Sequence, residues 1–491
     1  MPSFKVKVKW GKEIYPDIEV NTDEPPLVFK AQLFALTGVH PERQKVMIKG
    51  VTLKDDDWTN FKLKDGVTIL LMGSKEEDVP KEPVEKTVFV EDMSENELAT
   101  ALDLPAGLTN LGNTCYMNAT VQCLKSVPEL REALQKFEGN IAMSSNMMPA
   151  QSITAALRDL YNNMEKSKTI PPLLLLNVLH LAFPRFAEKN DHGYMQQDAN
   201  EFWTELIRML QQKLPAKQNN DVNAEKFKSL IDQFFGGTFD VELKCTEADD
   251  EPVTKSNEQF LQLSCFISQD VRYMHSGLRN KLQEQITKFS PTLGRDSVYT
   301  KTNKISRLPA YLTVQFVRFY YKEKEAINAK ILKDVKFPLD FDAFDLCTPE
   351  LQEKLSPMRA KFKEFEDRQI VLASESKDKG KNKGDSKSSE ALKKYEPYHF
   401  ENDLGSNNSG YYTLQAVLTH RGRSSSSGHY VGWVRQSGDS WVKCDDENVS
   451  PVTTEEILKL SGGGDWHCAY VLLYGPRQLE IIENLEKMDE S

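Results

Sequence analysis

The first 73 residues show the alternation of apolar and polar positions that a small mixed α/β unit requires. Apolar residues occupy every second position from Phe4 to Trp10 with lysines between them, which is the period-two pattern of a half-buried strand. Proline near the start and glycine after the end mark an amphipathic helix between Pro26 and Gly38. The remaining runs predict strands over 15–20, 45–50 and 67–72, which gives the order strand, strand, helix, strand, strand.

The pattern changes after this unit. Residues 75–105 carry prolines and charges with few apolar anchors, which predicts an extended, mobile linker. From 106 to 476 helical and strand patterns alternate, so we expect one large α+β domain. A lysine- and serine-rich insert at 374–394 has too few apolar residues to order itself, and a polybasic binding element is the alternative. Residues 477–491 are expected to form a charged tail.

Charge and cysteine content narrow the class of protein. The 62 basic residues fall short of the 73 acidic ones, and a net charge of −11 argues against general nucleic-acid binding. The seven cysteines are scattered without a C-x-x-C pair, so no disulfide framework is expected. The longest apolar run, 173–183, is too short for a membrane span, and the N-terminus lacks a signal-peptide core. We expect a soluble, cytoplasmic monomer without a cofactor, and the nucleus stays open as a second compartment.

The most informative stretch runs from Gly107 to Asn118 and contains Cys115. Helical spacing follows the cysteine until Pro128, so Cys115 is predicted at the N-terminus of a helix. Free N–H groups and the helix dipole favour the thiolate there, and the thiolate is the form that attacks a carbonyl carbon. Cys123 lies two turns further along the same helix, and we interpret it as an inert core residue.

A cysteine nucleophile needs a base, and the base needs an acceptor that orients it. Two short strand patterns flank residues 436–439, and a hairpin there would bring His429 beside Asp445. His429 would then take the thiol proton and later protonate the leaving amine. His420 has no acidic residue at the hairpin distance and is interpreted as a structural contact. Asp446 would face away from His429 in a regular strand, but a share in the same role stays open for it.

These pieces together resemble the ubiquitin-specific protease family, the large papain-like cysteine deubiquitinases. The resemblance covers essentially all of 106–474 and rests on several motifs in the family's order. It implies a papain-like fold with fingers, palm and thumb, and hydrolysis of the (iso)peptide bond after ubiquitin's C-terminal glycine. The matching segments are Gly107–Asn118, Gln196–Phe202, Leu308–Phe319, Val335–Pro338, Tyr412–Tyr430 and Ala469–Tyr474.

The resemblance also assigns roles to individual residues. Asn110 matches the side-chain donor of the oxyanion hole, although by itself it would be interpreted as a turn residue. Gln196 and Asp198 match positions that bind ubiquitin's C-terminal tail, where a carboxylate suits the tail's arginines. A role in capping the following helix stays open for both. The remaining matches are Cys115 as nucleophile, His429 as base and Asp445 as third member of the triad.

One departure from the family concerns metal binding. Many relatives bind zinc in the fingers through two C-x-x-C pairs, whereas the matching region 239–266 holds only Cys245 and Cys265. Two cysteines cannot fill a tetrahedral site and no histidine lies between them, so we predict no metal. Strand packing would then hold the fingers together, through Phe239, Val241 and Leu243 on one side and Leu261 and Leu263 on the other.

The segment Arg421–Gly428 directly precedes His429 and has little to pack with. Its composition and position predict a flexible loop that gates the cleft, with an inert surface connection as the alternative. Two arginines three and five residues before Ser426 resemble a basophilic kinase site, and a phosphate there would add negative charge beside the cleft. The serines of this predicted regulatory loop are Ser424, Ser425, Ser426 and Ser427.

The N-terminal unit resembles ubiquitin-like modules through Gly38–Gly50, which implies a β-grasp fold. The chain continues past it without a terminal Gly-Gly, so the module cannot be conjugated and is expected to dock. The resemblance implies the regulatory particle of the 26S proteasome as docking partner, ubiquitin and ubiquitinated proteins as substrates, and activation by the partner. Met47 and Met72 match ubiquitin's binding patch, with core-facing strand positions as the alternative. A non-catalytic, ubiquitin-binding regulator of the proteasome is the second function we consider.

Overall fold

The computed structural model describes residues 3–55, 57–59, 61–74, 104–142, 148–191, 193–217, 227–322, 327–378, 394–424, 427–464 and 466–481. The chain divides into two compact units, Met1–Met93 and Ser94–Ser491. Most of the predicted linker 75–105 lies outside the described residues. Within the described residues, no helix is both long and apolar enough to cross a membrane.

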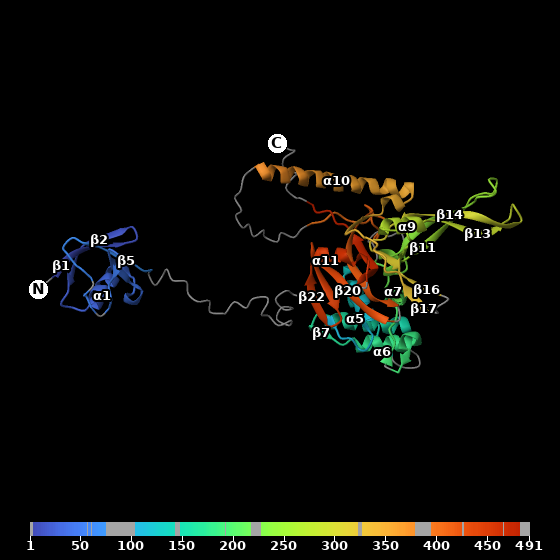
Figure 1. Cartoon of the computed structure of the whole chain (residues 1–491). Helices are drawn as coiled ribbons and strands as arrows, with labels where there is room; N and C mark the ends of the chain where they lie inside the picture. The colour runs from blue at the N-terminus through green and yellow to red at the C-terminus, as the bar shows by residue number, and fades with distance from the viewer. Residues whose placement is uncertain are drawn as a thin grey trace. The chain divides into compact units, whose positions relative to one another are not determined.

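The first unit is a mixed sheet with one helix packed across it, which confirms the predicted β-grasp fold (Figure 1). Phe29 and Leu33 of the helix are buried against the apolar face of the sheet. The helix ends at Gly38, whose φ of 73° requires a residue without a Cβ penalty. The elements are β1 (Ser3–Trp10), β2 (Glu13–Asn21), α1 (Pro26–Thr37), η1 (Pro41–Arg43), β3 (Lys45–Ile48), β4 (Val51–Thr52) and β5 (Thr68–Met72), in sheet order β2-β1-β5-β3-β4.

The thumb of the second unit is a group of helices around a core that includes Tyr116, Phe186 and Phe202. In Figure 1 the helices α5, α6 and α7 gather at one end of this unit. The helices are α3 (Cys115–Lys125), α4 (Pro128–Gln135), α5 (Pro149–Met164), α6 (Leu173–Ala182), η4 (Pro184–Ala187), α7 (Ala199–Lys213) and α8 (Leu230–Phe234). The short strands among them are β6 (Gly107–Leu108), β7 (Thr169–Ile170), β8 (Lys189–Asn190) and β9 (Gly193–Tyr194).

The palm is a large sheet that is buried on both faces. Tyr430 belongs to the thumb-side core, whereas Val431 and Trp433 belong to the core on the opposite face. Adjacent residues of a strand therefore serve different cores, as the pleat requires. The main path is β12 (Leu263–Phe266), β15 (Leu312–Val317), β23 (Cys468–Pro476), β19 (Tyr411–Ser424), β20 (Ser427–Ser437), β21 (Ser440–Asp445) and β22 (Asn448–Val452), joined by β16 (Phe319–Lys322), β17 (Ile327–Lys330) and β18 (Asp340–Asp342). The elements beside it are α9 (Met274–Lys281), η5 (Phe344–Leu346), α11 (Thr454–Leu458) and η6 (Lys459–Ser461).

The fingers form a separate four-stranded sheet whose strands β13 and β14 project from the unit (Figure 1). Val241 is buried there as predicted. The assignment of Leu263 to the fingers is wrong, because its strand pairs in parallel with β15 of the palm. Cys245 and Cys265 consequently lie in different sheets. The finger strands are β10 (Gly237–Cys245), β11 (Thr254–Phe260), β13 (Gln283–Ser290) and β14 (Arg295–Arg307), in the order β11-β10-β14-β13.

Two expectations about irregular segments need correction. Residues 374–378 of the predicted insert continue α10 (Pro349–Asp378), since they include helix-forming glutamate and lysine; residues 379–393 lie outside the described residues. The predicted tail does not begin at 477, because Leu479 is buried against α10 and Arg477 pairs with Glu366 at 2.8 Å. Apolar contact and this ion pair hold the chain as far as Ile481, and residues 482–491 lie outside the described part.

Candidate active site

Cys115 is the first residue of α3, as the helical spacing predicts. The N-cap residue Thr114 makes no side-chain capping bond, and its carbonyl oxygen accepts from the N–H of Met117, so the N–H groups of Cys115 and Tyr116 stay available at the thiol. Cys115 is 2% exposed, and its Sγ lies 3.5 Å from the backbone nitrogen of Tyr430. Cys123 is confirmed as a core residue, since it is fully buried and burial raises the pKa of its thiol well above the usual range.

The close approach of α3 to the palm strand β20 depends on Gly432. A Cβ on this residue would lie 3.1 Å from the carbonyl oxygen of Ala119 and 3.5 Å from the Cys123 Sγ. Glycine therefore allows the helix to rest directly on the strand. As a result, the N-terminus of α3 is held beside the beginning of β20, where His429 precedes Tyr430.

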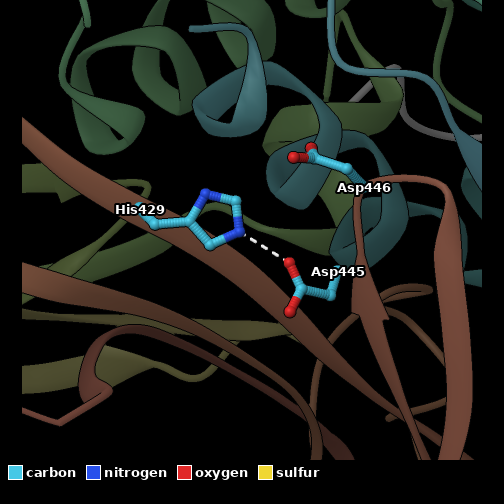
Figure 2. A group of neighbouring side chains, drawn as sticks. All are labelled: His429, Asp445 and Asp446. Atoms are coloured by element: carbon cyan, nitrogen blue, oxygen red, sulfur yellow. Dashed lines mark hydrogen bonds and ion pairs between the residues drawn. The ribbon is translucent and has the colours of Figure 1, made fainter.

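His429 and Asp445 face each other across the β20–β21 hairpin (Figure 2). The His429 Nε2 lies 2.6 Å from the Asp445 Oδ1, so the ring donates this proton and keeps Nδ1 for another partner. Hydrogen bonding to Asp445, and next to the Cys115 thiol, raises the pKa of His429 to about 10. Hydrogen bonding to His429 lowers the pKa of Asp445 below its usual range. The pair therefore favours an imidazolium beside the cysteine.

The expectation that Asp446 faces away from His429 is wrong, because Asp446 follows the end of β21 and has a φ of 53°, so the alternation of a regular strand does not apply to it. Figure 2 shows its carboxylate on the side of the imidazole, although the dashed line joins only Asp445 to the ring. The two Asp446 oxygens accept hydrogen bonds of 2.8 Å from the amides of Asn110 and Asn118. Burial raises the pKa of the Asp446 carboxyl. Although ligand atoms of His429, Asp445 and Asp446 all lie within 4.8 Å of one another, both Asp446 oxygens serve this amide network. The residue positions the loop before Cys115 through Asn110.

Asn110 is oriented by its neighbours on both ends of its amide. The Oδ1 accepts hydrogen bonds from the backbone nitrogens of Gly112 at 3.0 Å and Thr114 at 3.3 Å. The Nδ2 donates one hydrogen to Asp446. An amide nitrogen carries two hydrogens, so one N–H is left for a ligand near the N-terminus of α3. The sequence did not predict that the orientation of Asn110 depends on Asp446.

Gln196 and Asp198 occupy different environments. The Nε2 of Gln196 lies 3.5 Å from the Cys115 Sγ, so this side chain contacts the candidate nucleophile itself. Asp198 caps α7 through the nitrogens of Asn200 and Glu201, and it accepts a hydrogen bond of 2.8 Å from the Tyr470 hydroxyl. Burial raises the pKa of Asp198, although these hydrogen bonds oppose the shift. The capping role that the sequence left open is therefore present.

A cleft of about 340 Å³ continues from Asp198 between the thumb and the palm. Besides Asp198, the acidic lining residues are Glu201 and Glu205 of α7, and both lie 3.1 Å from the guanidinium of Arg185. The sequence alone did not predict a role for either glutamate or for Arg185. The glutamates follow Asp198 at helical spacing, which was the available signal. The cleft fits an extended segment that carries positive side chains.

His420 is confirmed as a structural residue. Its Nε2 lies 3.0 Å from the carbonyl oxygen of Ser427, and burial lowers the pKa of its imidazole to about 3. The ring is therefore neutral at ordinary pH. It packs beside Tyr430, with the ring centroids 4.6 Å apart, and supports the strand that carries His429.

The predicted irregular loop before His429 is shorter than expected. Residues 421–424 belong to β19 and Ser427 and Gly428 to β20, because backbone pairing continues to the pair Ser424–Ser427 without needing apolar side chains. Gly422 and Gly428 have φ values of 135° and 115° beside a register shift in this hairpin. Ser425 and Ser426 lie outside the described residues, and the gating role stays a prediction.

Comparison with known proteins now identifies the family. Residues 106–474 match the family described as "Ubiquitin carboxyl-terminal hydrolase". This chain belongs to that family. Membership places it among the thiol-dependent ubiquitinyl hydrolases, as the cysteine and histidine motifs predict.

Relatives are similar over nearly the whole chain. "Ubiquitin carboxyl-terminal hydrolase 7" of Arabidopsis thaliana is 41% identical over 97% of this chain and 99% of its own length. "Ubiquitin carboxyl-terminal hydrolase 14" of Caenorhabditis elegans is 42% identical over 98% and 95%. The solved SAGA Ubp8/Sgf11/Sus1/Sgf73 DUB module bound to ubiquitin aldehyde contains a chain with a TM-score of 0.51 and 21% identity, covering 76% of this chain and 70% of that one. This last likeness shows the fold.

Proposed function

We propose that this chain releases ubiquitin from conjugates by a Cys115–His429–Asp445 mechanism at the proteasome. The observation that carries the catalytic part is the placement of His429. Its Nε2 lies 2.6 Å from the Asp445 Oδ1, and the backbone nitrogen of the adjacent Tyr430 lies 3.5 Å from the Cys115 Sγ. Because Nε2 of the ring is bonded to Asp445, Nδ1 is the nitrogen that takes the thiol proton.

The reaction then proceeds in two halves. The Cys115 thiolate attacks the carbonyl carbon of ubiquitin's C-terminal glycine, and the carbonyl oxygen of that glycine becomes negatively charged in the tetrahedral intermediate. The free N–H of Asn110 and the uncapped N–H groups at the start of α3 stabilise that charge. His429 protonates the leaving lysine amine as the thioester forms. Water, deprotonated by His429, then hydrolyses the thioester and regenerates the thiol.

The acidic cleft supports binding of ubiquitin's arginine-containing tail. The tail would pass Gln196 at the nucleophile and continue along the cleft beyond Asp198. Asp198 already accepts hydrogen bonds from α7 and Tyr470, so Glu201 and Glu205 are the better partners for arginine. These glutamates must exchange Arg185 for the substrate's cations.

Docking on the 26S regulatory particle is supported by the open face of the first unit's sheet. Met72 and Leu70 are 50% and 39% exposed, and Met47 is half-buried directly opposite Leu70. The alternative that Met72 faces the core is therefore wrong. Methionine side chains at such a site adapt to apolar partner surfaces. Met72→Glu should weaken cosedimentation with proteasomes, whereas Leu36→Glu, a similarly exposed residue of α1 on the other side of the sheet, serves as the matched control.

Turnover of a fluorogenic ubiquitin substrate, with and without purified 26S proteasomes, tests the catalytic proposal. Cys115→Ser should abolish turnover under both conditions, and Cys123→Ser should retain most of it. Turnover by Cys115→Ser would reject the assigned nucleophile. No turnover by the wild type under either condition, with ubiquitin still bound, would favour the non-catalytic regulator.

A further inference from the structure

Lys443 contacts the carboxylate that orients the proposed base. It stands two residues before Asp445 on β21, so the two side chains share one face of the sheet. The Lys443 Nζ lies 2.7 Å from the Asp445 Oδ2, whereas the Oδ1 is bonded to His429. Each oxygen of the carboxylate therefore has its own partner.

Packing limits the freedom of this lysine. Lys443 lies directly opposite Trp433 on β20, and its ammonium is 5.8 Å from the centre of the indole ring. Trp433 is itself fixed, because it is buried and donates a hydrogen bond of 2.8 Å to the Thr419 hydroxyl. The side chains of Lys443 and Asp445 are only 28% and 26% exposed. This ion pair is consequently less screened than one on an open surface.

We propose that Lys443 is a positioning residue of the hydrolase. Its ammonium fixes the Asp445 carboxylate through Oδ2, and its positive charge weakens the attraction of that carboxylate for the protonated His429 ring. The inference rests on the proposed function. Without the lysine, the carboxylate would have the imidazole as its single charged partner and could turn about its bond to Cβ. The imidazolium would then sit less accurately beside Cys115 and would release its proton less readily.

The other charged and titratable groups around His429 allow the effect of Lys443 to be distinguished. His420 and His467 are buried, and burial lowers the pKa of each imidazole to about 3. Both rings therefore stay neutral in an assay that runs from about pH 5.5 to about pH 10.5. The groups that face His429 are Cys115 from α3, His420 and Arg421 from β19, Lys443 and Asp445 from β21, Asp446 after β21, and His467 before β23.

The experiment compares Lys443→Met, Lys443→Gln and Lys443→Arg in the full chain. Methionine keeps the contact with Trp433 but removes the charge, glutamine removes the charge with a polar end, and arginine retains a cation. Lys361→Gln is the control, because Lys361 forms an ion pair with Glu396 beside α10. The measurements are kcat and KM with a fluorogenic ubiquitin substrate, the pH profile of kcat/KM, and the rate of iodoacetamide alkylation of Cys115 against pH.

In both neutral variants we expect kcat to fall about tenfold, with KM within about twofold of the wild type. The substitution loosens the orientation of Asp445 and His429 but removes no contact with the substrate. Both limbs of the pH profile, and the alkylation profile, should move up by about 0.5–1 pH unit, because a cation has been removed. Lys443→Arg should recover most of kcat and the wild-type profile. A role in packing alone would change the thermal midpoint without displacing these profiles.

Profiles of the neutral variants that superimpose on the wild type, with kcat within about twofold, would overturn the proposal. An equally displaced profile in Lys443→Arg would also overturn it, since that variant keeps the charge. Either result would leave the proposed function intact as long as the wild type turns over and Cys115→Ser does not. If one neutral variant, Lys443→Met or Lys443→Gln, fails to fold, the remaining neutral variant and the alkylation profile of Lys443→Arg still test the proposal.

Discussion

Replacing Asp445 by asparagine should remove the charge that holds the proton on His429. Hydrogen bonding to Asp445, followed by the contact with the Cys115 thiol, raises the pKa of His429 from 6.5 to about 10. At about 1.4 kcal/mol per pH unit, this shift corresponds to roughly 3–5 kcal/mol in favour of the imidazolium. Asp445 supplies the larger part, so the variant should lose much of this preference.

The assay is the pH dependence of kcat/KM for a fluorogenic ubiquitin substrate. In the wild type, activity should persist to high pH, because loss of the imidazolium proton occurs near pH 10. In Asp445→Asn the alkaline limb should move toward about pH 7, and kcat should fall by about 10²–10⁴. Asp446→Asn removes the same charge from the next residue, and its alkaline limb should move much less. A larger displacement in Asp446→Asn than in Asp445→Asn would refute this reasoning.

The same shift should appear in stability. Since the folded-state pKa of His429 lies above its unfolded value, the contribution to folding is full below about pH 6.5. It is lost as the pH rises toward about 10. In urea unfolding, the free energy of unfolding of Asp445→Asn should therefore fall less than that of the wild type as the pH rises from about 6.5 to about 10.

Three further predictions concern the oxyanion hole, the cleft and the base of the fingers. Asn110→Ala should lower kcat by about 10²–10³ with little change in KM, because it removes a donor to the transition-state oxyanion; an unchanged kcat would exclude that role. Arg185→Gln should lower KM about two- to fivefold by freeing Glu201 and Glu205, because the Arg185 side chain is 44% exposed and its ion pairs are worth little; a raised KM would contradict internal competition. Asp403→Ala should reduce the free energy of unfolding by about 3 kcal/mol, because Arg307, 11% exposed, would lose its buried carboxylate; equal urea midpoints would contradict this.

The sequence predicted the parts of the site whose signals are local. Helical spacing after Cys115 placed it at a helix N-terminus, and two strand patterns joined by a short turn placed His429 beside Asp445. The β-grasp order of the first unit followed from the same kind of pattern. The alternation of a strand failed for Asp446, because β21 ends at Asp445 and the φ of 53° at Asp446 brings its carboxylate to the side of the imidazole.

Contacts between distant segments were beyond such patterns. The bond between Asn110 and Asp446 joins residues 336 positions apart, and no periodicity relates the two. Leu263 was assigned to the fingers because apolar alternation does not reveal which sheet a strand joins; its partner β15 begins at Leu312. The hairpin at 421–428 was predicted as a loop from its serines, although its backbone pairing does not depend on side-chain packing.

Covalent capture tests the central claim most directly. A ubiquitin with a C-terminal electrophile is incubated with the wild type, Cys115→Ser and Cys123→Ser, with and without proteasomes, and the adduct is located by peptide mass. The account predicts one adduct, on Cys115, in the wild type and in Cys123→Ser, and none in Cys115→Ser. An adduct on another of the seven cysteines, or none in the wild type under either condition, would contradict the assignment of Cys115 as the nucleophile.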